Sequence, residues 1–164
     1  MININIVLLE PEIPYNTGAI ARTCHAAGAV LHLIKPLGFD VSEKAVRRAG
    51  MDYWKETDVR YYDNYAHFLQ ENSGNMFFAT TKAQKKYTDV VYDNDSYIFF
   101  GKESAGLPEE LLLDNRENCI RVPMLEKTRS LNLSVSAGII LFEALRQNNF
   151  EGLSECGKLH RLEW

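Results

Sequence analysis

Short apolar runs that alternate with helical segments are the feature that most restricts how this chain can fold. The runs are rich in Ile, Val, Leu and Phe and are too short to be helices, so they are typical of buried strands. Parallel strands need a long crossover between them, and the intervening segments have the spacing of amphipathic helices. The alternation therefore predicts an α/β fold, with an open parallel sheet that helices cover on both faces. The clearest runs lie at residues 4–9, 30–34, 76–80, 97–100 and 119–122, with a weaker one at 59–62.

The helices are expected at residues 16–27, 64–71 and 133–146, with a shorter one that begins at Pro108 and another, capped by Ser42, that carries Arg48. The lysine-rich segment after Thr80 is expected to be a polar connection. Asn16 and Asn132 are suited to cap the first and the last of them, because an Asn side chain accepts hydrogen bonds from the free N–H groups of a first turn. Gly138 lies inside the last helix, where glycine costs about 1 kcal/mol relative to alanine. We expect another backbone, for example that of a second subunit, to pack closely there.

Length and composition indicate a single domain of ordinary globular type. The chain has 164 residues, of which 46% are hydrophobic and 24% charged. No apolar run approaches the roughly 20 residues that span a bilayer, and the N-terminal segment lacks the basic region of a signal peptide. We therefore expect a cytoplasmic protein without membrane contact. Residues 1–150 are expected to form the domain, and residues 151–164, which lose periodicity, a tail.

Metal binding and indiscriminate binding to polyanions are both poorly supported. Three widely spaced cysteines and four scattered histidines include no pair with zinc-ligand spacing, so no metal is expected. The net charge is −4, which argues against non-specific attraction to nucleic acid. Local basic clusters nevertheless lie around Arg48, around Lys82 and between Arg121 and Arg129. For each cluster alone, solvated surface is the commoner interpretation.

Two loops of glycine, proline and small polar residues carry the strongest functional signal. They follow the apolar runs that end at Phe100 and Val122, about twenty positions apart. Bends of this kind expose backbone N–H and C=O groups to a ligand, at the sheet edge where α/β proteins bind small molecules. Neither loop contains a dinucleotide-binding or a Walker motif, so a dinucleotide or a nucleoside triphosphate is poorly supported. The loops predict a site for another small cofactor.

Several side chains near these loops allow two interpretations. Glu103 could accept a hydrogen bond from a ligand, or it could help to cap the helix at Pro108; local rules favour neither. Asn132 is more simply a helix cap than a ligand contact. Gly18 and Arg22 share a face of the first helix, which leaves room for a phosphate or a sugar beside the guanidinium. A solvated arginine is the commoner outcome there.

Three segments in order resemble the three motifs of the SPOUT RNA methyltransferases. They are PEIPYNTGAIARTC at residues 11–24, FGKESAGLP at 100–108 and VPMLEKTRSLNLS at 122–134. The resemblance extends over nearly the whole chain. Within the superfamily the chain is most similar to the short, single-domain tRNA wobble-nucleotide 2′-O-methyltransferases of the TrmL type. Ala79 stands where that type usually has leucine.

The resemblance implies a SPOUT fold whose C-terminal part, about residues 76–146, forms a trefoil knot. General rules of chain topology would have rejected a knot. It also implies a bent S-adenosylmethionine in the knot loops, released as S-adenosylhomocysteine, and a homodimer with the active site at the subunit boundary. The residues implied to contact the cofactor are Ala79, Thr80, Gly101, Glu103, Val122, Met124, Ser130 and Leu131.

The reaction implied is methyl transfer to the ribose 2′-hydroxyl of the wobble nucleotide, C or U, in a tRNA anticodon stem-loop, with tRNA-Leu as the expected substrate. The implied catalytic residues are Arg22, Asn16, Ser130 and Asn132. A guanidinium is a poor base because its pKa exceeds about 12, so we expect Arg22 to hold a phosphate and stabilise the developing alkoxide. The residues expected to bind RNA are Arg22, Arg48, Lys82, Arg121 and Arg129.

Two other functions are compatible with the sequence. One is 2′-O-methylation of ribosomal RNA by an enzyme of the same superfamily. The other is a flavodoxin-like module that binds a nucleotide without catalysis.

Overall fold

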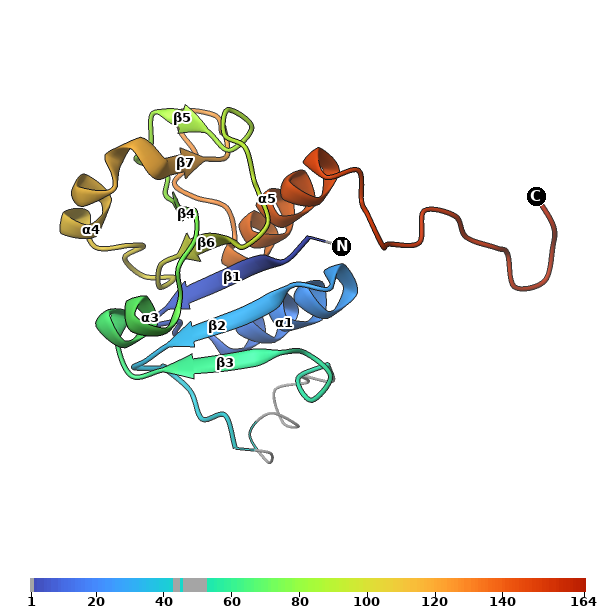
Figure 1. Ribbon diagram of the computed structural model, residues 1–164, viewed down its shortest axis with the longest axis horizontal. Coiled ribbons are helices and arrows are strands. Elements are labelled where there is room, and N and C mark those ends of the chain that lie inside the picture. The colour runs from blue at the N-terminus through green and yellow to red at the C-terminus, as the bar shows by residue number, and fades with distance from the viewer. Residues whose placement is uncertain (1, 43–44, 46–52) are drawn as a thin grey trace.

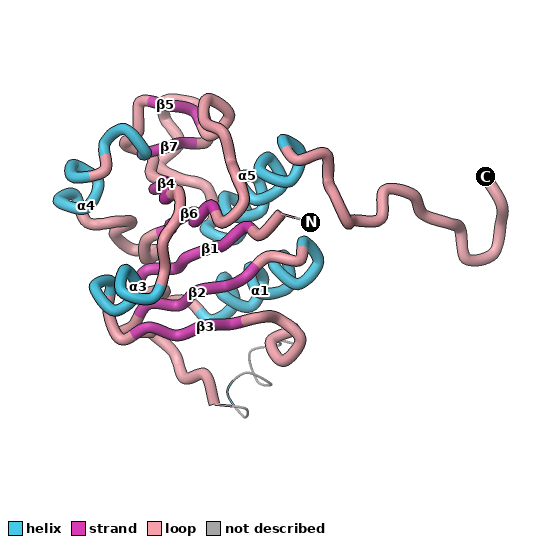
Figure 2. Tube along the Cα trace, in the orientation of Figure 1, coloured by secondary structure: helices cyan, strands magenta, loops and turns pink. Residues whose placement is uncertain are grey.

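Seven strands of the described chain form one sheet in which every pairing is parallel (Figures 1 and 2). The computed structural model describes residues 2–42, 45 and 53–164. The strand order is β3-β2-β1-β6-β4-β7-β5. The elements are β1 (Ile4–Leu9), α1 (Pro14–Ala27), β2 (Val30–Ile34), β3 (Val59–Tyr62), α3 (Tyr65–Glu71), β4 (Met76–Ala79), β5 (Lys85–Lys86), β6 (Ser96–Phe100), α4 (Glu109–Asp114), the 3-10 turn η1 (Arg116–Asn118), β7 (Cys119–Arg121) and α5 (Leu133–Gln147).

Helices cover both faces of the sheet, as predicted. Alternate residues of β1 show the division, because successive side chains of a strand point to opposite faces. Ile6 and Leu8 pack with the apolar sides of α1 and α5, whereas Val7 and Leu9 pack on the other face with residues of α3 and α4. Every residue of β1 is buried, which explains why the strand is apolar apart from Asn5.

The first helix begins two residues earlier than predicted, and Asn16 does not cap it. Pro14 is the first helical residue and Ile13 takes the capping position. Proline suits the first helical position because its fixed φ is helical and because an N–H there would have had no partner within the helix. Asn16 therefore lies inside the first turn, with its side chain free for contacts elsewhere. Gly28 ends the helix in the left-handed conformation, at φ 67°.

The last helix has the predicted cap. The Asn132 Oδ1 atom accepts hydrogen bonds from the backbone N–H groups of Ser134, at 2.9 Å, and Val135, at 3.3 Å. The close backbone contact expected at Gly138 is absent within the described chain, because a Cβ built there meets no atom within 4 Å. The space beside Gly138 opens to the outside of α5.

Two local predictions were wrong. The lysine-rich segment after Thr80 contains a strand, β5, which pairs with β7 at the edge of the sheet. Lysine is rare in strands, and a two-residue strand has no periodicity to detect, but lysines are common on exposed edges. Pro108 is not the first residue of α4 but precedes it, with an extended ψ of 140°.

Residues 151–164 contain no helix or strand and lead away from the sheet (Figure 1). No helix of the described residues is long and apolar enough to span a bilayer. Among the same residues, no group of three His, Cys, Asp or Glu side chains could hold a metal ion. The short helix predicted after Ser42, with Arg48, lies outside the described residues.

Candidate functional site

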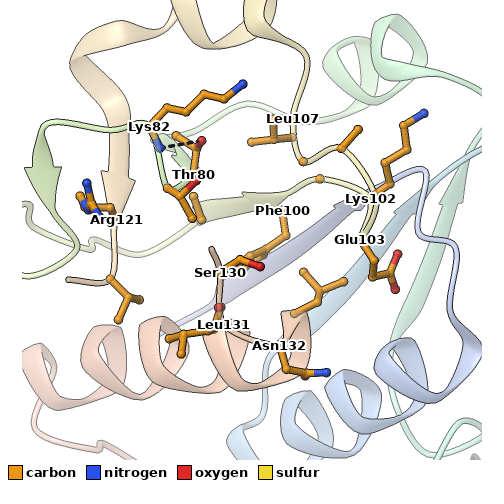
Figure 3. A pocket seen from close by; sticks show the side chains of 18 of the residues that line it. Thr80, Lys82, Phe100, Lys102, Glu103, Leu107, Arg121, Ser130, Leu131 and Asn132 are labelled. Carbon is orange, nitrogen blue, oxygen red and sulfur yellow. Dashed lines mark hydrogen bonds between the residues drawn. The ribbon is translucent and has the colours of Figure 1, made fainter. Parts of the chain in front are cut away.

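A cavity of about 450 Å³ lies where β4, β6 and β7 end (Figure 3). This is the edge at which the sequence predicted a ligand, because open α/β sheets bind at the carboxyl ends of their strands. Loops that follow the three strands form most of its wall, and the beginnings of α1 and α5 close it. All the residues predicted to contact the cofactor line this cavity, namely Ala79, Thr80, Gly101, Glu103, Val122, Met124, Ser130 and Leu131.

Most of the other predicted site residues line the same cavity. They are Asn16, Asn132, Lys82, Arg121 and Arg129. The structure thus brings together residues that are more than a hundred positions apart, although their roles stay predictions. Sequence reasoning missed some of the wall, because positions of α5 such as Ile140 look like ordinary core. The missed lining residues include Ile13, Leu133, Ser136 and Ile140.

The loop after β6 closes on itself and requires glycine at position 101. The backbone N–H of Gly106 donates to the carbonyl of Lys102, at 2.8 Å. A Cβ on Gly101 would lie 2.0 Å from the carbonyl carbon of Gly106 and 2.2 Å from the nitrogen of Leu107. Gly106 itself has a φ of 72°, in the left-handed region. Any side chain at position 101 would therefore force this wall of the cavity open.

Two carboxylates join this loop to the segment that precedes α1. The Glu103 carboxylate accepts the backbone N–H groups of Glu12, at 2.8 Å, and Ile13, at 3.1 Å. In return, the Glu12 carboxylate accepts the N–H and the hydroxyl of Ser104, both at 2.9 Å. These bonds keep the pKa of Glu12 below its usual range. Glu103 therefore binds N–H groups just before α1. It does not cap α4, as one interpretation of the sequence had predicted.

Asn16 connects the three sequence motifs through hydrogen bonds. Its amide nitrogen donates to Glu103 Oε1 at 3.1 Å, and its oxygen accepts from Asn132 Nδ2 at 3.0 Å. Asn132 in turn caps α5. A chain of side chains thus runs from the loop after β6, through α1, to the start of α5. No local signal could have revealed it, because Asn16 and Asn132 are 116 positions apart.

A salt bridge joins the loop after β6 to Glu10, the residue that follows β1. The Lys102 ammonium lies 3.0 Å from a carboxylate oxygen of Glu10. This hydrogen bond and the negative charge of Glu10 raise the pKa of Lys102. Glu10 adopts φ 54°, a conformation that is uncommon outside glycine.

Arg22 lies apart from the cavity in this chain. It follows Asn16 by six residues, which is roughly 9 Å along a helix at about 1.5 Å per residue. Its side chain is exposed, and the guanidinium carbon stands 5.0 Å from the centre of the Tyr53 ring. A single chain therefore does not bring Arg22 to the predicted cofactor residues. Arg48 lies outside the described residues.

The cavity suits a ligand with both a flat apolar part and polar groups. Leu131, Met124 and Ile140 supply apolar wall, while Ser130 and Thr80 supply hydroxyls. Figure 3 shows Ser130, Leu131 and Asn132 in succession above the start of α5. Thr80 is held in place by its N–H, which donates to the carbonyl of Ile120 at 2.9 Å. Adenosine and an amino-acid group together have this mixed character.

The sequence profile of the SpoU rRNA Methylase family matches residues 3–142, which is most of the chain and includes every element around the cavity. The chain belongs to the SpoU methylase family. A relative from Geobacillus stearothermophilus, named as a candidate tRNA (cytidine(34)-2′-O)-methyltransferase, is 49% identical over 155 residues. That alignment covers 92% of this chain and 99% of the relative.

Solved structures of other proteins resemble this one closely. One, described as concerning the 2-OH methylation of C/U34 on tRNA, has a TM-score of 0.84 and 39% identity, with 92% of this chain and 99% of that chain covered. A second, an AdoMet-bound rRNA methyltransferase from Sinorhizobium meliloti, has a TM-score of 0.76 and 30% identity. It covers 88% of this chain, whereas this chain covers 56% of that protein. The predicted α/β fold with a parallel sheet and the predicted membership of the SPOUT (SpoU) methyltransferases are therefore confirmed.

Proposed function

We propose that this chain is a tRNA methyltransferase that transfers a methyl group from S-adenosylmethionine to the 2′-hydroxyl of nucleotide 34, the wobble nucleotide. The observation that carries the proposal is the convergence of all three motifs on one cavity, joined through Asn16. The degree of similarity supports tRNA over ribosomal RNA. The relative named for cytidine 34 is 49% identical to this chain, whereas the ribosomal RNA enzyme is 30% identical.

The lining residues fit the proposed cofactor. Gly101 lets the loop after β6 close against the backbone of Gly106 and form one wall, the apolar wall can take an adenine ring, and Ser130 and Thr80 can bind polar groups. We assign Ala79, Gly101, Val122, Met124 and Leu131 to the contact with the cofactor. When bound, S-adenosylmethionine supplies a methyl group that is activated by its sulfonium, so the chemistry requires no metal. Glu103 acts here by holding the cavity wall to α1.

The protein must align the ribose with the methyl donor and help its hydroxyl to lose a proton. Asn16 and Asn132 hold the starts of α1 and α5 in register at the mouth of the cavity, and Ser130 lies beside them. Arg22 stabilises the developing alkoxide and binds a phosphate. Because Arg22 lies away from the cavity of its own chain, the Arg22 that serves each cavity comes from the partner subunit.

A homodimer is supported by an exposed apolar stripe on α5. Val135 is 50% exposed and Phe142 is 43% exposed, and Gly138 lies between them on the same side of the helix. The spacing of these residues matches one helix face. Tyr15, which is 70% exposed, adds an aromatic ring on the neighbouring helix α1. A second subunit on this face would fill the space at Gly138 and bring its own α1 toward the cavity.

The finer features of the fold belong to the same proposal. Residues 76–146 form a trefoil knot, which the strand order supports: the chain passes from β4 out to β5, returns to β6 inside the sheet, and leaves again to β7. Residues 1–150 form the methyltransferase domain, and residues 151–164 are a tail. The substrate is the anticodon stem-loop, expected to be that of tRNA-Leu, and the enzyme works in the cytoplasm. Lys82, Arg121 and Arg129 bind the RNA at the cavity mouth, with Arg48.

The decisive experiment incubates the protein with labelled S-adenosylmethionine and total tRNA and then maps the methylated nucleotide. Label on the 2′-oxygen of nucleotide 34 is expected. If total tRNA stays unlabelled and ribosomal RNA is labelled instead, the chain would be a ribosomal RNA 2′-O-methyltransferase of the same superfamily. Binding of a flavin or a nucleotide, without any heat on titration with S-adenosylmethionine, would favour a non-catalytic module.

The role of Arg22 is tested by Arg22→Ala. Turnover should be lost while calorimetry still detects cofactor binding. Weakened cofactor binding with normal turnover of the bound enzyme would contradict the assignment. Phe142→Glu should separate the subunits in sedimentation and abolish methyl transfer, because each cavity would lose its Arg22.

A further inference from the structure

A second cavity, of about 390 Å³, lies beside the first. Thr80 and Lys82 line both cavities, so the segment that follows β4 is the wall between them. Figure 3 shows the Lys82 side chain extending away from Ser130 and Leu131. Its ammonium binds Glu109, which lines only the second cavity. A ligand strand that crosses Lys82 would therefore pass from one cavity to the other.

The floor of the second cavity is apolar. Ala83, Leu112 and Cys119 are all buried, and Leu113 stands at the rim with 74% of its surface exposed. The Cys119 thiol points to the backbone carbonyls of Leu112 and Asn115, at 3.4 and 3.5 Å. Burial raises its pKa. The thiol therefore acts as a small apolar group in this floor and not as a nucleophile.

The rim carries three cations and two carboxylates. Lys82 pairs with Glu109 at 2.6 Å, and Lys85 pairs with Glu117 at 2.9 Å. Both pairs are largely exposed to water, and such pairs contribute little free energy, so Lys82 can bind a phosphate at small cost. Lys85 also donates to the backbone carbonyl of Glu117, at 2.7 Å, and keeps a third N–H for a phosphate. The third cation is Arg116, and the rim as a whole is therefore positive.

Arg116 completes a surface suited to a nucleobase. Its guanidinium makes one long contact, 3.5 Å, with the side-chain oxygen of Gln84. A planar guanidinium above an apolar floor is an arrangement on which a splayed-out RNA base can stack, while an amide such as Gln84 can bind the edge of the base. Phosphates on either side of the base would meet Lys82 and Lys85.

We propose that the second cavity binds the base of a nucleotide that flanks the methylated one, stacked on Arg116. This inference rests on the proposed function, since it assumes that the first cavity receives the target ribose. The second cavity would then keep the anticodon loop open by binding the base of a neighbouring nucleotide.

The test uses three anticodon stem-loops: the intact RNA and two versions that lack the base on the 5′ or the 3′ side of nucleotide 34. Wild type, Arg116→Ala and Lys85→Ala are compared by kcat/KM, and cofactor affinity is measured by calorimetry. The matched control is Lys86→Ala, because Lys86 is the next residue of β5, pairs with Asp89 and does not line the cavity. Circular dichroism checks that each variant is folded.

On the intact RNA, Arg116→Ala should lower kcat/KM about tenfold, as expected for the loss of one stacked base. Lys85→Ala should give a smaller loss with a weaker salt dependence, and Lys86→Ala should stay within about twofold of wild type. With one of the two abasic RNAs, wild type should itself lose about tenfold and Arg116→Ala should lose nothing more. Cofactor affinity should be unchanged throughout.

An Arg116→Ala effect that is the same on all three RNAs, or that is absent, would overturn the inference while leaving the proposed function intact. Failure of wild type to methylate any of the three RNAs, or total tRNA, would instead remove the proposed function and this inference with it.

Discussion

The polar side chains around His32 and those around Asn16 differ in how far water reaches them. His32 is fully buried on β2, with its ring nitrogens 2.9 Å from the Tyr62 hydroxyl and 3.0 Å from the Asn5 side-chain oxygen. Asn16 lies at the mouth of the cavity, half-buried, with Glu103 and Asn132 as partners. Each cluster joins three elements of the structure by hydrogen bonds.

Burial decides what each cluster contributes. An unpaired polar group costs more in the core than at the surface, so the His32 cluster should affect stability when it is disturbed. The Asn16 cluster holds two loops and two helix ends around a cavity that must stay open to ligands. Its disturbance should change binding and turnover more than the free energy of unfolding. The predictions below test this division, from the largest expected effect to the smallest.

Gly101→Ala should have the largest effect. The added methyl would meet the backbone of residues 106 and 107, which cannot move as a side chain can. We expect the free energy of unfolding to fall by about 3 kcal/mol and cofactor binding to weaken at least about 100-fold. Chemical denaturation and calorimetry measure the two. Gly157→Ala, where a Cβ meets nothing within 4 Å, is the control. Normal cofactor affinity in the Gly101 variant would show that this loop does not shape the site.

Acid should destabilise the fold through His32. Burial is the main reason that its pKa falls from 6.5 to about 4. Between these values the unfolded chain binds a proton that the folded chain does not, so stability should fall as the pH drops through this range and level off below it. The full loss is about 3 kcal/mol at roughly 1.4 kcal/mol per pKa unit. His32→Asn should be less stable at pH 7 but should lack this loss on acidification. An identical pH profile in the two proteins would contradict the assignment.

Tyr62→Phe should cost about 1.5 kcal/mol of stability, because it leaves a buried nitrogen of His32 without its hydroxyl partner. The kcat/KM should not change. Tyr61→Phe is the matched control, since Tyr61 precedes it on β3 and is 38% exposed. A loss of turnover at unchanged stability in Tyr62→Phe would break the division between the two clusters.

Glu103→Gln should lower kcat/KM about fivefold and change the free energy of unfolding by less than about 1 kcal/mol. The Glu103 carboxylate accepts hydrogen bonds from three N–H donors. The amide of glutamine has the same size, but its N–H group faces one of those donors, so that hydrogen bond is lost. Steady-state kinetics and denaturation check both values, with Glu163→Gln in the exposed C-terminal segment as the control. A large loss of stability with normal turnover would place Glu103 in the core of the fold.

The predictable parts of the fold were those whose signal is local. Strands β1 and β2 fall on the predicted residues, because a strand covered on both faces is largely apolar; Asn5 and His32 are the exceptions, and they pair with each other. Asn132 caps its helix as predicted, because a short polar side chain can accept the free N–H groups of the first turn. The edge strand β5 escaped prediction because its stability comes from its pairing with β7 and not from its own two lysines.

The candidate site could be predicted as a set of residues but not as a set of contacts. Every residue predicted to contact the cofactor lines the cavity, although other lining residues, such as Ile13 and Ile140, were missed. The motifs did not indicate that Glu103 binds the backbone at Glu12, because a pairing across about ninety positions leaves no local trace. They also did not show that Arg22 lies apart from the cavity, because this depends on the folded sheet placing the start of α1, and not its middle, at the cavity.

The amino-acid sequence by itself determined the alternation of strands and helices, the glycine-containing turn in the loop after Phe100, and the family to which the chain belongs. These depend on side-chain size, backbone freedom and the order of motifs, which are properties of neighbours in the chain. Only the tertiary structure decided that Asn16 joins Glu103 to Asn132, that Glu103 serves α1, and that a second cavity adjoins the first. Those features come from segments that are distant in the sequence and that the folded sheet brings together. The contacts between them form, and stabilise the protein, only once the backbone has folded.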